Sequence, residues 1–196
     1  MAAGLGTRLR PLSNHWPKPV LPIDGKPVVV TLVHELAEAG CEEIVVVTGH
    51  LAEQVEELLR PLPYNLRFVR QPPGLGSADA VLRARSRPPY LVVAADTAFG
   101  EGDLGRFARD SAGADGAVAA HGDLRAPLWM VGERVHRFLE PLPGTPPYEL
   151  QQVFAIAIDA GARVSAIQVG RTRDLTEPVD LMRENFPYLR VTEERR

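Results

Sequence analysis

Apolar positions along the chain fall into two patterns, which are continuous runs and single residues at helical spacing. The continuous runs EIVVVT at 43–48 and YLVVAA at 90–95 predict strands that are covered on both faces. With shorter apolar segments, the pattern predicts strands at 43–48, 66–69, 90–95, 117–120, 127–131 and 163–169. Apolar residues three or four positions apart predict helices at 27–40, 51–60, 77–85, 103–112, 148–160 and 177–185.

Strands that are separated by helices predict an α/β fold, with a mixed, mainly parallel sheet flanked by helices on both faces. Ligands of such folds bind beyond the carboxyl ends of the strands. Asp96 directly follows the run 90–95, and the glycine-containing loop 74–76 precedes the helix predicted at 77–85, with Ser77 as its expected N-cap. We expect a single domain over residues 1–196, because no repeat or low-complexity linker divides the chain.

Composition excludes several classes of protein. The 196 residues carry a net charge of −3, which gives no broad basic surface for nucleic acid. Cys41 is the single cysteine, so an internal disulfide framework and a cysteine-cluster zinc site are excluded. No apolar run approaches the length of a membrane span, and no basic region followed by an apolar stretch opens the chain. We therefore expect a cytoplasmic protein with no membrane partner.

The opening segment combines glycines with fixed cations. Gly4 and Gly6 allow a sharp turn whose backbone N–H groups face an anion, and Arg8 adds a planar cation suited to phosphate. Lys18 lies between two prolines, which stiffen its backbone. These features indicate a polyphosphate site. It is not a Walker A loop, because no Gly-Lys-Ser/Thr follows, and the dinucleotide fingerprint fails because Leu9 stands where a third glycine is needed.

At this point the sequence resembles the sugar nucleotidyltransferases, such as glucose-1-phosphate thymidylyltransferases. The resemblance rests on GLGTRLRPL at 4–12, PKP at 17–19, QPPGLGSADA at 71–80, the strand 90–96, YEL at 148–150 and RDLTEPVDL at 173–181. It implies a nucleotide-diphospho-sugar transferase fold of Rossmann-like type. It also implies Mg²⁺-dependent transfer of a nucleoside monophosphate from a nucleoside triphosphate (NTP) to a sugar 1-phosphate, with release of pyrophosphate.

The resemblance also implies roles for individual residues: Arg8 and Lys18 in catalysis, Asp96 and Asp174 as Mg²⁺ ligands, Glu149 in sugar binding, and Gly4, Leu5, Gly6, Thr7, Gln71, Gly76 and Ser77 in nucleotide binding. The chemistry suits such a site, because a phosphate nucleophile with a pKa near ~6 is already ionised and needs no catalytic base. What it needs is positioning and neutralisation of negative charge.

Each carboxylate also has a structural interpretation. Asp96 could cap its loop, Asp174 could pair with Arg171 or Arg173, and Glu149 lies in a first helical turn, where the helix dipole favours it.

Two departures from the family's pattern bear on function. Family members carry an apolar strand before the glycine loop, whereas Met1 lies almost on it. We therefore expect that the protein starts upstream of Met1. Without that strand, we expect a gap in the sheet and a glycine loop that lacks its anchor. In addition, no lysine follows Lys26, so the family's acceptor-binding lysine is absent, although Arg125 could replace it.

Two alternatives therefore stay open. One is transfer to another phosphorylated acceptor, such as a molybdopterin, glycerol or choline phosphate. The other is a non-catalytic regulatory protein that binds nucleotides or sugar phosphates. Homo-oligomerisation is compatible with either.

Overall fold

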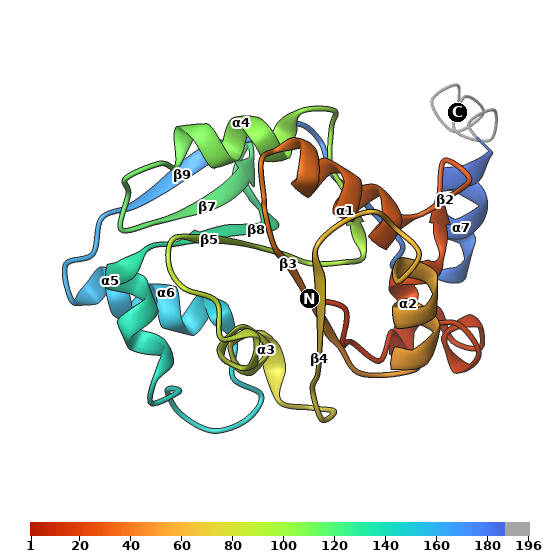
Figure 1. Cartoon of the computed structure of the whole chain (residues 1–196), viewed down its shortest axis with the longest axis horizontal. Helices are drawn as coiled ribbons and strands as arrows, with labels where there is room; N and C mark the ends of the chain where they lie inside the picture. The colour runs from red at the N-terminus through yellow and green to blue at the C-terminus, as the bar shows by residue number, and fades with distance from the viewer. Residues whose placement is uncertain (187–196) are drawn as a thin grey trace.

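The computed structural model describes residues 1–186 and contains the predicted alternation of strands and helices (Figure 1). The strands are β1 (Pro22–Ile23), β2 (Lys26–Pro27), β3 (Ile44–Thr48), β4 (Leu66–Arg70), β5 (Tyr90–Val93), β6 (Thr97–Ala98), β7 (Gly116–His121), β8 (Leu124–Val131), β9 (Val164–Gln168) and β10 (Arg173–Asp174). The helices are α1 (Val28–Glu38), α2 (Ala52–Leu59), α3 (Gly76–Ala84), α4 (Asp103–Asp110), α5 (Glu133–His136), α6 (Leu150–Asp159) and α7 (Pro178–Asn185). The short 3₁₀ turns are η1 (Thr7–Leu9), η2 (Leu12–Asn14), η3 (Lys18–Val20) and η4 (Arg137–Leu139). All six helices and all six strands predicted from the pattern are present, with ends that shift by a few residues.

Strand β3 is covered on both faces, as its continuous apolar run predicts. Ile44 and Val46 belong to the main core with apolar residues of α1 and α2. Val47 packs instead with Ala80 and Ala84 of α3. Alternate side chains of one strand therefore bury against helices on opposite faces, which is the packing expected of an α/β sheet.

The sheet is mixed, and it consists of a two-stranded part and a four-stranded part. Strands β3 and β4 pair in parallel, and the second part has the order β5-β8-β7-β9. Strand β8 runs antiparallel to both β5 and β7, whereas β7 and β9 are parallel. The predicted α/β fold with a mixed sheet is confirmed. The parallel share is smaller than predicted, because β7 and β8 form a hairpin that inserts β8 between β7 and β5.

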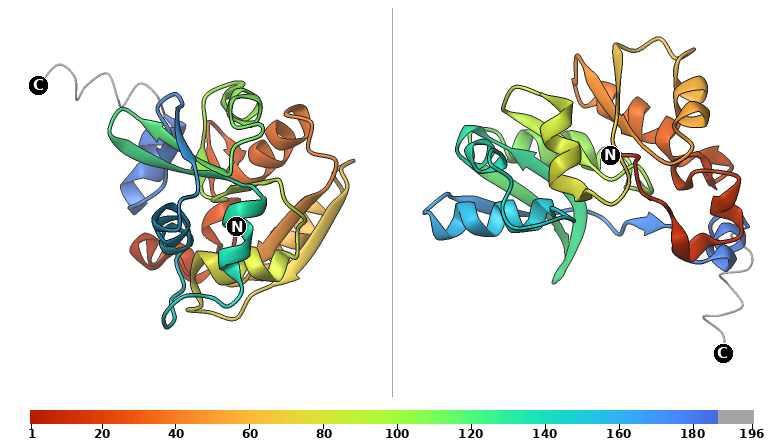
Figure 2. Two further views of the ribbon diagram at one scale, coloured as in Figure 1. Left: turned by 90° about the vertical axis from the view of Figure 1, so that its left-hand side faces the viewer. Right: turned by 90° about the horizontal axis from the view of Figure 1, so that it is seen from below.

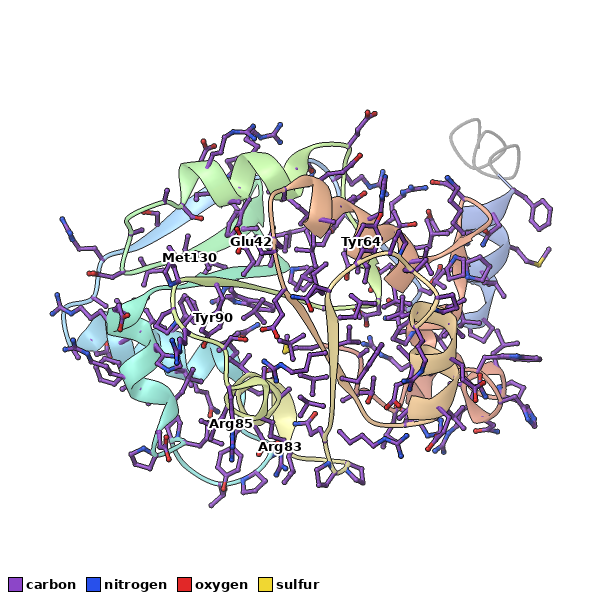
Figure 3. The ribbon with its side chains drawn as sticks, in the orientation of Figure 1. Glu42, Tyr64, Arg83, Arg85, Tyr90 and Met130 are labelled. Carbon is purple, nitrogen blue, oxygen red and sulfur yellow. The ribbon has the colours of Figure 1, made fainter. Side chains whose placement is uncertain are left out.

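The two parts of the sheet meet at the first two residues. The N–H of Ala2 donates to Val47 O at 2.7 Å, and the Met1 α-amino group donates to Val93 O at 2.7 Å. Beyond these bonds, a cavity of about 820 Å³ separates β3 from β5, and Val45 is among its lining residues. Figure 3 labels Tyr90 and Met130, which also line it. The glycine loop does have an anchor, contrary to expectation, because Met1 and Ala2 bond to both neighbouring strands.

The last described elements return to the start of the chain. Figures 1 and 2 show α7 beside the hairpin formed by β1 and β2. The side-chain amide of Asn185 donates to Pro22 O at 2.8 Å and accepts from the N–H of Gly25 at 2.8 Å. Arg173 pairs with Asp24 of the same hairpin. These bonds fix the position of β10.

No helix within residues 1–186 is both long and apolar enough to cross a membrane. Residues 187–196 of the predicted domain lie outside the described part of the chain.

Candidate active site

A lysine lies between the two aspartates that the sequence suggests as metal ligands. Lys18 Nζ is 2.7 Å from Asp96 Oδ2 and 3.8 Å from Asp174 Oδ2. The Lys18 side chain is 13% exposed, whereas those of Asp96 and Asp174 are 34% and 52% exposed. The ammonium is thus largely shielded and neutralises two carboxylates that still face solvent.

Strand pairing explains why residues so distant in sequence meet here. Asp96 follows β5 closely, and the next residue, Thr97, opens β6. Strand β10 pairs antiparallel with β6, and Asp174 lies opposite Thr97. Hydroxyl groups support both carboxylates, since Thr97 Oγ1 donates to Asp96 at 3.3 Å and Thr176 Oγ1 donates to Asp174 at 3.1 Å. Asp174 therefore pairs with Lys18 rather than with Arg171 or Arg173, and Arg173 points to the β1–β2 hairpin.

The glycine loop forms one wall of a cavity of about 520 Å³, which Gly4, Leu5, Gly6, Thr7, Arg8, Lys18 and Asp96 line. Gly6 has φ +59°, a left-handed conformation that favours glycine, and it leads into η1. Gly4 has no positive φ, and a Cβ there would meet nothing within 4 Å. The turn therefore depends on Gly6, whereas Gly4 leaves open space above the backbone.

The opposite wall comes from the segment between β4 and α3. Gln71, Gly74, Gly76 and Ser77 all line the same cavity. Gly76 has φ +86°, and a Cβ at this position would lie 2.4 Å from Tyr148 O. The start of α3 is thus packed directly on the backbone that precedes α6.

Ser77 is not the N-cap of its own helix, so that prediction is wrong. It lies inside α3, and its Oγ accepts from the N–H of Leu150 at 2.8 Å and donates to Glu149 Oε2 at 2.6 Å. Ser77 therefore accepts a hydrogen bond from a free N–H group in the first turn of α6, a helix that begins more than seventy residues later.

Glu149 is exposed and is not among the residues that line the cavity, although its partner Ser77 is. Arg125 lies near the turn between β7 and β8 and is likewise not a lining residue. The structure thus brings together the glycine loop, Lys18, Asp96, Gln71 and the start of α3, with Asp174 joined through Lys18, and it leaves Glu149 at the margin.

The two carboxylates of Asp96 and Asp174 suit Mg²⁺ better than a metal ion that takes all of its ligands from the protein. Within residues 1–186 no three His, Cys, Asp or Glu side chains are arranged to hold a metal ion. Magnesium commonly binds one or two carboxylates and completes its shell with water and substrate phosphates. Two partly exposed carboxylates beside a glycine loop suit that mode.

One buried residue of this region, Asp79, is not predicted by the sequence pattern to belong to the site. Asp79 of α3 is 7% exposed, and its carboxylate accepts hydrogen bonds from Gln71 and Arg83. The available signal was an aspartate in the first turn of a helix with an arginine four residues later, which is typical of an ordinary helical ion pair. Only the structure shows that Gln71 shares this carboxylate.

The glycine loop and Asp96 lie at the edge of an α/β sheet where ligands of such folds bind, beyond the carboxyl ends of the strands. Comparison with known families makes this specific: residues 1–163 match the MobA-like NTP transferase domain, and the chain belongs to that family. Asp174 lies beyond the matched stretch.

Two curated relatives illustrate the similarity. A 2-aminoethylphosphonate cytidylyltransferase of Lancefieldella rimae is 50% identical over 54 residues, which are 28% of this chain and 22% of that protein. The UTP–glucose-1-phosphate uridylyltransferase AglF of Haloferax volcanii is 31% identical over 103 residues, which are 50% of this chain and 42% of that protein. The matched regions thus span less than half the length of these relatives.

The fold agrees with a solved structure. UDP-glucose pyrophosphorylase from Acinetobacter baumanii superposes with a TM-score of 0.75 and 18% identity, over 100% of this chain and 97% of that one. At this identity the likeness establishes the fold. It agrees with the predicted nucleotide-diphospho-sugar transferase type.

Proposed function

We propose that this chain is a Mg²⁺-dependent nucleotidyltransferase that transfers a nucleoside monophosphate from an NTP to a sugar 1-phosphate. The observation that carries the proposal is the Lys18 ammonium between Asp96 and Asp174, beside the glycine-loop cavity. Membership of an NTP transferase family and the activity in the name of the uridylyltransferase relative support it.

In the proposed reaction, an oxygen of the acceptor phosphate attacks the α-phosphorus of the NTP. The bond from that phosphorus to the bridging oxygen breaks, and pyrophosphate leaves with that oxygen. Asp96 and Asp174 would hold Mg²⁺, which neutralises phosphate charge when it is bound. No protein base is required, because the acceptor phosphate is already ionised.

Arg8 and Lys18 would each neutralise a different part of the phosphate charge. Arg8 is exposed, lines the cavity and makes no ion pair within residues 1–186, so its guanidinium is available to the β- and γ-phosphates. Lys18 sits beside the carboxylates and supplies positive charge to the reacting phosphate. Positioning and electrostatic stabilisation of this kind account for most of the catalysis in phosphoryl transfer.

A different phosphorylated acceptor is the second candidate. No lysine follows Lys26, and the cytidylyltransferase relative is named for an acceptor that is a phosphonate, not a sugar phosphate. Both acceptors present a tetrahedral phosphorus group with a nucleophilic oxygen, so the same site chemistry serves either.

The test is pyrophosphate release from each common NTP with a panel of acceptors, with Mg²⁺ and with EDTA. We expect turnover with one or two NTPs, only with Mg²⁺, and loss of turnover in Asp96→Asn with an unchanged melting temperature. Asp123→Asn is the matched control, because that carboxylate is exposed in the turn between β7 and β8. Full activity of Asp96→Asn, or turnover in EDTA, would contradict the proposal. Mg²⁺-dependent nucleotide binding with no turnover on any acceptor would favour the regulatory alternative.

A further inference from the structure

The outer edge of β9 carries backbone groups without partners. Strand β9 ends the order β5-β8-β7-β9, and it pairs in parallel with β7. The N–H of Val169, which directly follows β9, donates to Ala120 O of β7 at 2.8 Å. Since alternate residues of a strand direct their backbone groups to opposite sides, the odd-numbered residues of β9 face β7. The N–H and C=O groups of Val164, Ala166 and Gln168 therefore point away from β7, and they make no hydrogen bond within residues 1–186.

The residues of β9 do not protect this edge against pairing with another strand. The strand reads Val-Ser-Ala-Ile-Gln, with no charge and no proline, and Ser165, Ala166 and Gln168 are exposed. Figure 1 shows β9 at the outer side of β7, beside α4. Native edge strands commonly carry charges or proline that oppose pairing with a second chain. Strand β4, at the edge of the two-stranded part, does carry such charges in Arg67 and Arg70.

The free backbone groups of β9 are complementary to those of a second β9. In a dimer with a twofold axis, the two copies of an edge strand run antiparallel. If Ala166 lies at the axis, it faces Ala166 of the second copy, and Val164 faces Gln168 of the second copy. Residues opposed in this way exchange two hydrogen bonds in an antiparallel pair. Every outward N–H and C=O group of β9 would then have a partner.

Charge and side-chain size permit this register. Ala166, at the centre, is small and exposed, so the two strands can approach closely. Arg163 would face Val169 of the second copy, and Arg171 would face Gly161. Like charges that lie directly opposite each other destabilise a pair of strands, and this register brings no two arginines opposite each other.

We propose that β9 is a dimer interface, at which two copies of this chain pair their β9 strands antiparallel about Ala166. The two four-stranded parts then form one continuous sheet across the interface. The occupant of the edge is a second copy, because the free groups of β9 match themselves in number and position. No residue of β9 lines the glycine-loop cavity, so each copy keeps its own cavity. This inference is independent of the proposed function.

The first test measures the mass of the wild-type chain and of Ala166→Pro by light scattering after gel filtration, over a wide range of concentrations. Proline removes an N–H that β7 does not use, so it suits an edge position and the strand should persist. We expect a wild-type dimer, and at least ~10-fold weaker dimerisation in Ala166→Pro, because the two central hydrogen bonds are lost.

Leu124→Lys is the matched control for this test. Leu124 is 74% exposed at the turn between β7 and β8, and its replacement leaves β9 unchanged. It should dimerise like wild type. A wild-type chain that is monomeric at every concentration would overturn the proposal. Dimerisation that is lost in Leu124→Lys but kept in Ala166→Pro would overturn it as well.

The second test examines the register and does not depend on the proline variant. Ala166→Cys and Ser165→Cys are compared under mild oxidation, each with Cys41→Ser. In the proposed register the two copies of residue 166 have Cα atoms about 5.5 Å apart, which suits a disulfide. Ser165 faces Ile167 instead, so its two copies lie too far apart. We expect a covalent dimer from Ala166→Cys and little from Ser165→Cys, and equal crosslinking of the two variants would overturn the proposal.

Discussion

Substitution of Gly76 by alanine tests whether the start of α3 is packed directly on the segment before α6. A Cβ at Gly76 would lie 2.4 Å from Tyr148 O and 2.6 Å from Tyr148 N, so backbone must move. Movement weakens two backbone hydrogen bonds across this contact, from Tyr148 N–H to Leu75 O at 2.9 Å and from Ala78 N–H to Tyr148 O at 2.8 Å.

The magnitude follows from these parts. The left-handed φ of +86° costs an alanine about 1–2 kcal/mol. Each weakened hydrogen bond adds about 1 kcal/mol. The free energy of unfolding should therefore fall by about 3–4 kcal/mol in Gly76→Ala. Gly74→Ala is the matched control, since Gly74 has φ +78° but a Cβ there would meet nothing within 4 Å. It should lose only the conformational cost of about 1–2 kcal/mol.

The measurement is urea unfolding of the wild-type chain and both variants, followed by circular dichroism. The difference between the two variants isolates the cost of the close approach, because the two φ angles are similar. Equal losses in Gly76→Ala and Gly74→Ala would refute the reasoning and would mean that Tyr148 yields freely.

Three further predictions follow from the site and the core. Lys18→Met should lower kcat by about 10²–10³-fold. Mg²⁺ alone should raise its melting temperature more than that of wild type, because two carboxylates are left without their cation; no gain over wild type in thermal melts would count against the pair as a metal site. Ser77→Ala should cost about 1 kcal/mol in urea unfolding, because the first turn of α6 loses its cap, and an unchanged midpoint would show that water replaces the hydroxyl. Burial and the nearby Asp103 and Glu38 raise the pKa of Glu35 from 4.5 to about 7. The stability that protonated Glu35 contributes is therefore fully present below pH 4.5 and is lost as the pH rises through 7. Glu35→Gln should have a higher melting temperature than wild type at about pH 8 and nearly the same melting temperature at about pH 5. A difference in melting temperature that stays constant across pH would contradict this.

Local patterns predict the elements of this fold well, and strand pairing is where they fail. The apolar run at 43–48 predicts a buried strand, because burial on both faces requires such a run whatever the neighbours are. Strand β8 is also apolar, but nothing in its own residues says that it lies antiparallel between β5 and β7. That order is set by the whole chain.

The same division holds for the candidate site. The position of Asp96 after an apolar strand is enough to predict that it lies at a ligand-binding edge of the sheet. The position of Lys18 between Asp96 and Asp174 depends on the β6–β10 pairing. Strands of only two residues leave no recognisable pattern in the sequence, so this pairing could not be predicted. Ser77 was misassigned for a related reason, since its partner Leu150 belongs to a distant helix. The roles of the site residues remain predictions that the experiments above test.

The pairing of β10 with β6 has a consequence for how the chain acquires activity as it is made. Asp174 is supplied by a late segment, and the bonds of Arg173 and Asn185 to the β1–β2 hairpin bring that segment back to the earliest part of the chain. Domains generally fold as units. Until β10 has been synthesised, a nascent chain therefore lacks one of the two carboxylates, whatever part of the glycine loop has already emerged. In the proposed mechanism, the chain gains competence for catalysis only once β10 is in place.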